Sequence, residues 1–292
     1  MKKISAFFSL IKNSYSADKI ILHGLFDPKI IVLLFIQPWL LKKCYWLIWG
    51  GDLYSYQLAT RDRRWKIKEF FRRPVIKHIG HLVTYIDGDI ELARQWYGAK
   101  GQYHECLMYP SNVYREYPIA GNTDKNINIQ IGNSADPSNN HLDVLERLLP
   151  FRDQDIAIFA PLSYGSPEYA RTVIEAGTTM FGEKFFPMTD FMPFDKYLAF
   201  LGKIDIAIFN HKRQQAMGNT ITLLGLGKKV YLRNDVTPWA MLESNETTAY
   251  NIAEISLAPI DAITREKNKS SIKKNFSETK LIYQLKEIFN NK

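Results

Sequence analysis

The chain has 292 residues, which is enough for two domains of ordinary size. With 46% hydrophobic and 23% charged residues it has the composition of a globular protein and not of a disordered one. Cys44 and Cys106 are its two cysteines, and both lie in apolar runs. This excludes a disulfide framework and indicates reduced thiols in a cytoplasmic protein. No cluster has metal-ligand spacing, so we expect no structural zinc.

The first 110 residues alternate between short strands and helices. The apolar stretch 30–41 is too short to span a bilayer, so we expect no transmembrane segment. Residues 110–126 contain prolines, a glycine and polar side chains, which is typical of a linker. The expected strands are 19–23, 44–49, 81–85 and 105–108, and the expected helices begin near 29 and cover 61–80 and 89–97.

The second half repeats this alternation, with nearly continuous apolar strands such as 156–159 and 204–209. Such runs are typical of parallel strands that are buried on both faces. The sequence therefore predicts an α/β protein of two Rossmann-like domains facing a cleft. We expect strands at 127–132, 155–160, 184–186, 205–209 and 228–232, and helices at 139–149, 166–177, 194–202, 217–226 and 236–243. The expected domains are 1–120 and 121–275, with a helix in 276–292 that packs back on the first.

The positive charge of +8 is concentrated in residues 61–80. Aromatic and apolar residues are interleaved with the basic ones there, which favours the headgroup region of an anionic membrane. The alternatives are a solvated helix that packs its apolar side on the domain, and nucleic-acid binding, which no motif supports. The residues predicted to contact a membrane are Arg63, Arg64, Trp65, Lys68, Arg72 and Arg73.

Three loops of the second half follow expected strands, where ligands bind in such sheets. Glycine lets the backbone approach a phosphate, and helix N-termini present free N–H groups to anions. Each loop alone is equally compatible with an ordinary capped turn. The predicted donor-binding residues are Gly132, Asn133, Ser134, Asp136, Ser138 and Asn139 in the first loop, Ser163 and Tyr164 in the second, and Arg213, Gln214, Gln215, Gly218, Asn219 and Thr220 in the third.

Two residues of the first half, His23 and Asp52, also follow expected strands. A carboxylate anchored at a strand end can act as a general base, so Asp52 is the candidate base if the reaction inverts the sugar configuration. Asp52 is equally suited to cap the following helix, and His23 to be a satisfied buried histidine. The sequence does not decide between these roles.

Four segments carry a resemblance to a known family. They run in the same order from about residue 18 to about residue 242 and are similar to the bacterial 4-acetamido-4,6-dideoxygalactosyltransferases. The segments are His23-Gly24-x-Phe26-x-Pro28, Trp46-x-Ile48-Trp49-Gly50-x-Asp52-Leu53-Tyr54, Gly132-Asn133-Ser134-x-Asp136-x-Ser138-Asn139-x-His141 and Arg213-Gln214-Gln215-x-x-Gly218.

The resemblance implies a GT-B glycosyltransferase that moves a deoxyamino sugar, similar to Fuc4NAc, from a dTDP- or UDP-sugar donor. The acceptor it implies is a polyprenyl-diphosphate-linked saccharide at the cytoplasmic face of the inner membrane, in common-antigen, O-antigen or capsule synthesis. It places the donor on the second domain, and His23 and Asp52 on the acceptor side. It also implies a further βαβ unit ahead of Met1, so the first domain is expected to be shortened.

We expect no cofactor and no metal, because a GT-B enzyme offsets the charge of the leaving diphosphate with helix N-termini and basic side chains. Asp87-Gly88-Asp89 has the letters of a metal-binding DxD motif, but it begins a helix of the first domain. The competing hypothesis is a noncatalytic protein that binds a nucleotide sugar or a membrane surface. An NAD-dependent oxidoreductase is disfavoured, because no GxGxxG with a downstream acidic residue is present.

Overall fold

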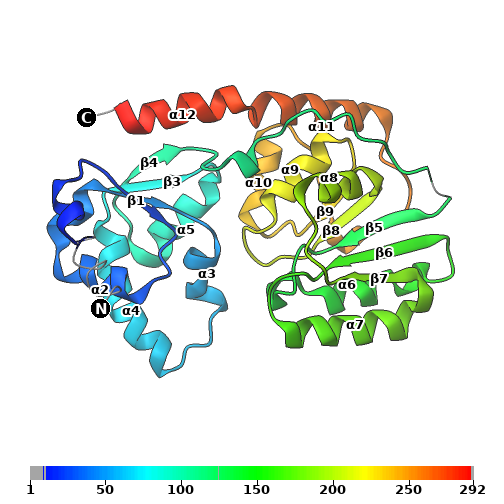
Figure 1. Cartoon of the computed structure of the whole chain (residues 1–292), viewed down its shortest axis with the longest axis horizontal. Helices are drawn as coiled ribbons and strands as arrows, with labels where there is room; N and C mark the ends of the chain where they lie inside the picture. Colours follow the sequence, from blue (N-terminus) through cyan, green and yellow to red (C-terminus); the bar gives the residue numbers. More distant parts are fainter. Residues whose placement is uncertain (1–8, 10, 124, 291–292) are drawn as a thin grey trace. The chain divides into compact units, whose positions relative to one another are not determined.

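The computed structural model describes residues 9, 11–123 and 125–290 and divides the chain into two compact units (Figure 1). Unit 1 contains the residues up to Met108 together with those from Tyr283, and unit 2 contains residues 109–282. Both are α/β units built on a parallel sheet. No helix of the described part combines the length and the apolar character that a membrane crossing needs.

Unit 1 holds a four-stranded sheet whose strand order, β1-β2-β3-β4, follows the chain. Right-handed connections in such an order place the connecting helices on one face, and the buried Trp46 and Leu82 belong to the core formed with them. The elements are β1 (Ile20–His23), α2 (Pro28–Ile36), the 3₁₀-helix η1 (Pro38–Lys43), β2 (Cys44–Leu47), α3 (Gly51–Leu58), α4 (Arg63–His78), β3 (His81–Thr84), α5 (Asp87–Tyr97) and β4 (Gln102–Glu105).

Unit 2 holds a six-stranded sheet in the order β10-β9-β8-β5-β6-β7. Figure 1 shows α6 and α7 on one side of this sheet and α8 and α9 on the other. The main elements are β5 (Ile127–Ile131), α6 (His141–Leu148), β6 (Ile156–Pro161), α7 (Pro167–Phe181), β7 (Phe185–Met188), α8 (Phe194–Lys203), β8 (Ile206–Phe209), α9 (Met217–Gly225), β9 (Lys229–Leu232), α10 (Thr237–Ser244), β10 (Tyr250–Asn251) and α11 (Ala262–Asn275). Short 3₁₀-helices are η2 (Pro110–Asn112), η3 (Pro137–Asn139), η4 (Leu149–Phe151), η5 (Gly182–Lys184) and η6 (Ile252–Glu254).

Helix α12 (Glu278–Asn290) ends the described chain and runs from unit 2 into unit 1. Within unit 1, its Gln284 accepts a hydrogen bond from the Leu107 amide at 2.9 Å and donates one to Glu105 at 3.2 Å. Strand β4 ends three residues earlier than expected. The apolar run Cys106-Leu107-Met108, which suggested a strand, is buried as a loop that contacts this helix.

The segment expected to be a linker, 110–126, packs on unit 2. The Tyr114 hydroxyl donates to the Gly225 carbonyl at 2.9 Å, and the Tyr114 amide donates to the Phe276 carbonyl at 2.8 Å. Helices α3 and α11 were not expected. Helix α11 buries the polar Asn268 and Ser271 beside Ile272, so it lacks the apolar period by which helices are recognised.

Candidate functional site

The centre of the candidate site is the strand β5, which lies between β8 and β6 in the sheet of unit 2. The chain proceeds from β5 to β6 on one side and later from β8 to β9 on the other. The connections that leave β5 and β8 therefore run in opposite directions along the sheet, and their first residues flank the point of reversal. Ligands of open parallel sheets bind at this reversal, beyond the carboxyl ends of the strands.

The loops after β5 and β6 are joined through their backbones. The Ala135 amide donates to the Tyr164 carbonyl at 2.7 Å, and the Ser166 amide donates to the Ala135 carbonyl at 2.9 Å. The Asn133 side-chain amide also donates to the Tyr164 hydroxyl at 2.7 Å. The structure thus brings together the first and second of the predicted loops.

The loop after β8 joins the same group through side chains. The Ser138 hydroxyl donates to Gln215 Oε1 at 2.6 Å, and Gln215 Nε2 donates to Asn133 Oδ1 at 3.3 Å. The Asn140 side chain donates to the Asn210 carbonyl at 2.7 Å. All three predicted loops therefore converge at one end of the sheet.

Asn139 is the buried hub of the first loop. Its Oδ1 accepts from the Asn133 amide at 2.9 Å and lies 2.8 Å from His211 Nε2. Its Nδ2 donates to Ser134 Oγ and to the Asp136 carbonyl. Because both polar groups of this side chain are occupied by protein partners, we assign Asn139 to holding the loop and not to contacting a ligand.

Gly132 begins this loop in the left-handed region, with φ of 61°. A Cβ atom there would lie 2.3 Å from His141 Nε2 and 2.7 Å from Asn139 Oδ1. Glycine is therefore required both by the backbone conformation and by the two side chains packed against it.

Helix α9 begins in the site after Ala216, a non-glycine residue with φ of 56° and no side-chain cap. In the described part of the chain, the amides of Met217, Gly218 and Asn219 donate no hydrogen bond to the protein. Unsatisfied amides at a helix N-terminus form a site for an anion. Glycine at position 218 allows the Ser111 carbonyl oxygen to pack against the start of α9, because a Cβ atom there would lie 2.6 Å from that oxygen.

Five buried side-chain atoms nearby have no hydrogen-bond partner among the described residues: Gln130 Oε1, Nδ1 and Nε2 of His141, Gln214 Oε1 and Thr220 Oγ1. Buried polar groups nearly always have a partner, so such atoms at the end of a sheet mark a place for a polar ligand or water. Tyr197 of α8 lies close to Gln130 and Asn219, and burial raises its pKa to about 12. Tyr197 is therefore a neutral phenol at this site.

Two buried histidines, His141 and His211, support the loops. Burial lowers the pKa of His141 to about 4, and burial together with Arg213 and His141 lowers the pKa of His211 to about 3. Both imidazoles are therefore neutral near pH 7. The carboxylate of Asp136 is the opposite case. Although burial opposes it, the hydrogen bonds from Ser138 lower its pKa and keep it charged.

The other predicted donor residues differ in their exposure and in their hydrogen-bond partners. Ser163 and Tyr164 are exposed on the second loop, Ser134 and Thr220 are buried, and Arg213 directs its guanidinium to the Gln214 carbonyl at 3.0 Å. Sequence reasoning missed Gln130, Asn140, Asn210 and Tyr197 as site residues. Gln130 carried a usable signal, because it is a polar residue inside a central, otherwise apolar strand.

Asp52 of unit 1 is not placed as a general base, which corrects the prediction. Its carboxylate is buried and accepts four hydrogen bonds: from the amides of Leu25 (2.9 Å), Trp49 (3.0 Å) and Leu53 (3.0 Å) and from the Trp46 indole (2.6 Å). Its lone pairs are thus engaged by the protein, and an acceptor hydroxyl has no access to them. The expected alternative, a cap of the following helix, is not seen either: the N-cap of α3 is Gly50, and the Asp52 carboxylate instead fixes the segments after β1 and β2.

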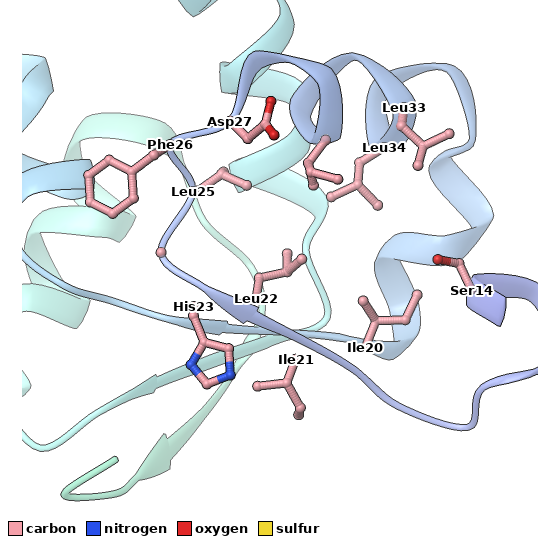
Figure 2. A pocket seen from close by; sticks show the side chains of 12 residues that line it. Ser14, Ile20, Ile21, Leu22, His23, Leu25, Phe26, Asp27, Leu33 and Leu34 are labelled. Carbon is pink, nitrogen blue, oxygen red and sulfur yellow. The ribbon is translucent and has the colours of Figure 1, made fainter. Parts of the chain in front are cut away.

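His23 ends β1 with an exposed side chain at a pocket of about 350 Å³ (Figure 2). Apolar side chains of β1 and α2, among them Leu22, Leu33 and Leu34, form most of the lining. Figure 2 shows the His23 ring turned away from α2. The pocket belongs to unit 1.

The basic helix predicted over 61–80 is α4, and one of its predicted membrane contacts is wrong. Arg72 is fully buried, and its guanidinium donates to Glu69 at 2.8 Å, to the Tyr97 hydroxyl at 2.7 Å, to Ser55 at 2.8 Å and to the Asp52 carbonyl. Arg72 therefore joins α3, α4 and α5 from inside. Arg63 and Arg64 are exposed, whereas Trp65, Lys68 and Arg73 are half-buried.

The model of the family described as 4-alpha-L-fucosyltransferase, glycosyl transferase group 56, matches residues 5–266, which confirms the resemblance seen in the sequence.

Solved structures share the fold at low sequence identity. Sucrose-phosphate synthase from Thermosynechococcus elongatus has a TM-score of 0.67 at 12% identity over 97% of this chain and 75% of its own. A glycosyltransferase from Rickettsia africae has a TM-score of 0.61 at 15% identity, and the match covers 98% of this chain and 81% of that protein. Anabaena HepE, solved in complex with UDP-glucose, has a TM-score of 0.65 at 10% identity, and the match covers 97% of this chain and 80% of that protein. These similarities confirm the predicted GT-B fold class.

Proposed function

We propose that this chain, which belongs to the 4-alpha-L-fucosyltransferase family (glycosyl transferase group 56), transfers a deoxyamino sugar similar to Fuc4NAc. The chain is a glycosyltransferase of GT-B fold. The proposed donor is a dTDP- or UDP-sugar, and the proposed acceptor is a saccharide linked to a polyprenyl diphosphate. The proposed process is the synthesis of a bacterial surface polysaccharide: common antigen, O-antigen or capsule.

One observation supports the donor site above the others: three loops converge on the uncapped N-terminus of α9, next to buried polar atoms without partners. In the proposed complex the donor diphosphate accepts hydrogen bonds from the amides of Met217, Gly218 and Asn219. The Arg213 and Lys212 side chains follow β8 and add positive charge nearby. As the glycosidic bond breaks, negative charge grows on the diphosphate, and these groups stabilise it.

The proposed membrane contact is an exposed face of unit 1 formed by α2, η1 and α4. Ile36, Ile67 and Phe70 are 64%, 62% and 66% exposed there, and Phe35 packs against Phe70 with ring centroids 5.9 Å apart. Exposed Arg63, Arg64 and Lys66 lie on the same helix as Ile67 and Phe70. Apolar side chains bordered by cations suit the headgroup region of an anionic bilayer. We therefore propose a peripheral location at the cytoplasmic face of the inner membrane.

The donor proposal is tested by melting the purified protein with a panel of dTDP- and UDP-sugars and by measuring transfer to a lipid-linked saccharide. We expect one donor to raise the melting temperature. Thr220→Val removes the unpartnered hydroxyl and should raise the donor Kd about tenfold, which corresponds to about 1.4 kcal/mol. Thr222→Val, two residues further along α9, is the matched control and should leave the Kd unchanged.

Binding of a donor without transfer to any acceptor would favour a noncatalytic nucleotide-sugar protein. If no nucleotide sugar shifts the melting temperature, the proposed donor site is wrong.

A further inference from the structure

Two aromatic side chains stand exposed at the carboxyl ends of neighbouring strands of unit 1. Phe26 follows β1 and is 44% exposed, and Trp49 follows β2 and is 46% exposed. Their rings meet edge to face, with centroids 6.0 Å apart and an interplanar angle of 72°. Large aromatic side chains are usually covered in a folded domain, so a pair of them held in the open needs an explanation.

The pair is held in place by Asp52. Oδ2 of its carboxylate accepts from the Leu25 amide at 2.9 Å, and Oδ1 accepts from the Trp49 amide at 3.0 Å. Leu25 directly precedes Phe26, so one buried carboxylate fixes the loop of each aromatic residue. Because both loops are already ordered, a ligand that binds there does not have to offset the loss of their conformational entropy.

The surroundings of the pair differ from those of the exposed apolar face on α4. The exposed Ile67 and Phe70 are bordered by arginines and a lysine, as an anionic surface requires. Along the chain, Phe26 instead follows the exposed, polar His23 and directly precedes Asp27, whose carboxylate caps α2. This setting offers aromatic surface beside hydrogen-bonding side chains, which suits a ligand that has an apolar face and polar groups at its rim.

We propose that Phe26 and Trp49 form a stacking platform for a pyranose ring of the acceptor saccharide, with Asp52 as its positioning residue. A pyranose presents C–H groups on its face and hydroxyls on its rim. The face packs on an aromatic ring, while the rim hydroxyls reach polar side chains such as His23. The identity of the ring as the acceptor rests on the proposed function. The platform itself rests on the geometry of unit 1.

The platform is tested without any transfer reaction by saturation-transfer NMR of the whole protein with the methyl glycosides of N-acetylglucosamine, glucose and galactose. We expect saturation to reach the axial ring protons of at least one glycoside. Trp49→Ala should reduce the transfer at least fivefold, and Trp49→Phe should restore most of it. Phe191→Ala removes an 84% exposed aromatic side chain of unit 2 and should have no effect. Absence of saturation for all three glycosides, or equal saturation in Trp49→Ala, would overturn the platform.

Kinetics then separate this inference from the proposed function. With a lipid-linked acceptor, Trp49→Ala should raise the acceptor KM at least tenfold and leave the donor KM unchanged. Active wild-type enzyme with an unchanged acceptor KM in Trp49→Ala would refute the acceptor role of the platform alone. Wild-type protein that binds glycosides but transfers no sugar would refute the proposed function and leave the platform standing.

Discussion

His211 Nε2 lies 2.8 Å from Asn139 Oδ1, and this contact links the loop after β8 to the loop after β5. The same oxygen accepts from the Asn133 amide at 2.9 Å, so the two donors share one buried acceptor. A neutral His211 with its proton on Nε2 satisfies this arrangement. The candidate donor site is therefore built on buried imidazoles that remain uncharged in the folded protein.

The first prediction is a loss of stability in mild acid. Each imidazole titrates near pH 6.5 in the unfolded chain, but burial lowers the pKa of His141 to about 4 and that of His211 to about 3 in the fold. Below pH 6.5 the unfolded chain binds protons that the folded chain does not. The contribution of the two imidazoles to the free energy of unfolding is therefore fully present above this pH and is lost as the pH falls toward 4. The limiting slope is about 2.7 kcal/mol per pH unit for the two groups together.

Urea unfolding of unit 2, followed between about pH 7 and about pH 5, measures this slope. His141→Gln should reduce it by about half, because one of the two sites is lost. His78→Gln removes an exposed imidazole of unit 1 and should leave it unchanged. A slope that is the same in His141→Gln and in the wild type would refute the assignment.

The second prediction concerns Gly132. Its replacement by alanine adds a methyl group 2.3 Å from His141 Nε2, in a backbone conformation with φ of 61°. We expect unit 2 to lose about 3 kcal/mol or more, from strain plus a clash that the buried His141 cannot relieve. The donor Kd should rise as well, because the loop that carries Asn133 shifts.

Gly98→Ala is the matched control for this change. Gly98 has a similar φ of 66°, but no atom lies within 4 Å of the added Cβ. It should cost only about 1 kcal/mol, the penalty for a left-handed alanine. Equal losses in the two variants, measured by thermal unfolding, would show that backbone strain alone explains Gly132.

The sequence predicted most strands of both sheets because parallel strands buried on both faces are continuous apolar runs, as in Ile206–Phe209. It also predicted which loops converge, because carboxyl ends of parallel strands lie at one edge. It did not predict α11, whose packing face is polar, with Asn268 donating to the Thr248 carbonyl at 2.9 Å.

The roles of charged residues were harder to predict, because burial of a charge depends on partners distant in sequence. Arg72 has the same local pattern as the exposed Arg63 and Arg64, yet it is buried by Tyr97 and Ser55. Asp52 looked like an accessible base, yet its partners include Leu25, which is 27 residues away. Spacing along one helix or at one strand end carries no such information.

The third prediction separates the two roles of Asp52. In Asp52→Asn, one accepting oxygen becomes an amide group that faces N–H donors, so at least one pair of hydrogen bonds is lost. We expect the melting temperature to fall and the acceptor KM to rise, while the shape of the pH–kcat profile stays the same. Loss of the acidic limb of that profile, with unchanged melting, would restore the general-base role.

The fourth prediction separates surface arginines from the buried one. Arg63→Gln with Arg64→Gln removes two exposed cations and should weaken binding to vesicles of phosphatidylethanolamine with phosphatidylglycerol by about tenfold or more, at about 1 kcal/mol for each charge. The melting temperature should not change. Arg72→Gln should instead lower the melting temperature and leave vesicle binding unchanged. It leaves Glu69 buried without its 2.8 Å partner, at a cost of about 3 kcal/mol or more of the free energy of unfolding.

Cosedimentation and thermal unfolding of the same three proteins test this pair of outcomes. Vesicles of phosphatidylethanolamine alone are the control for charge, and added salt should release the wild type, since surface attraction is screened. Vesicle binding that is unchanged in the Arg63 and Arg64 double variant would show that these arginines serve another partner. In that case the apolar residues of the face, Ile36, Ile67 and Phe70, would also need another explanation than a bilayer.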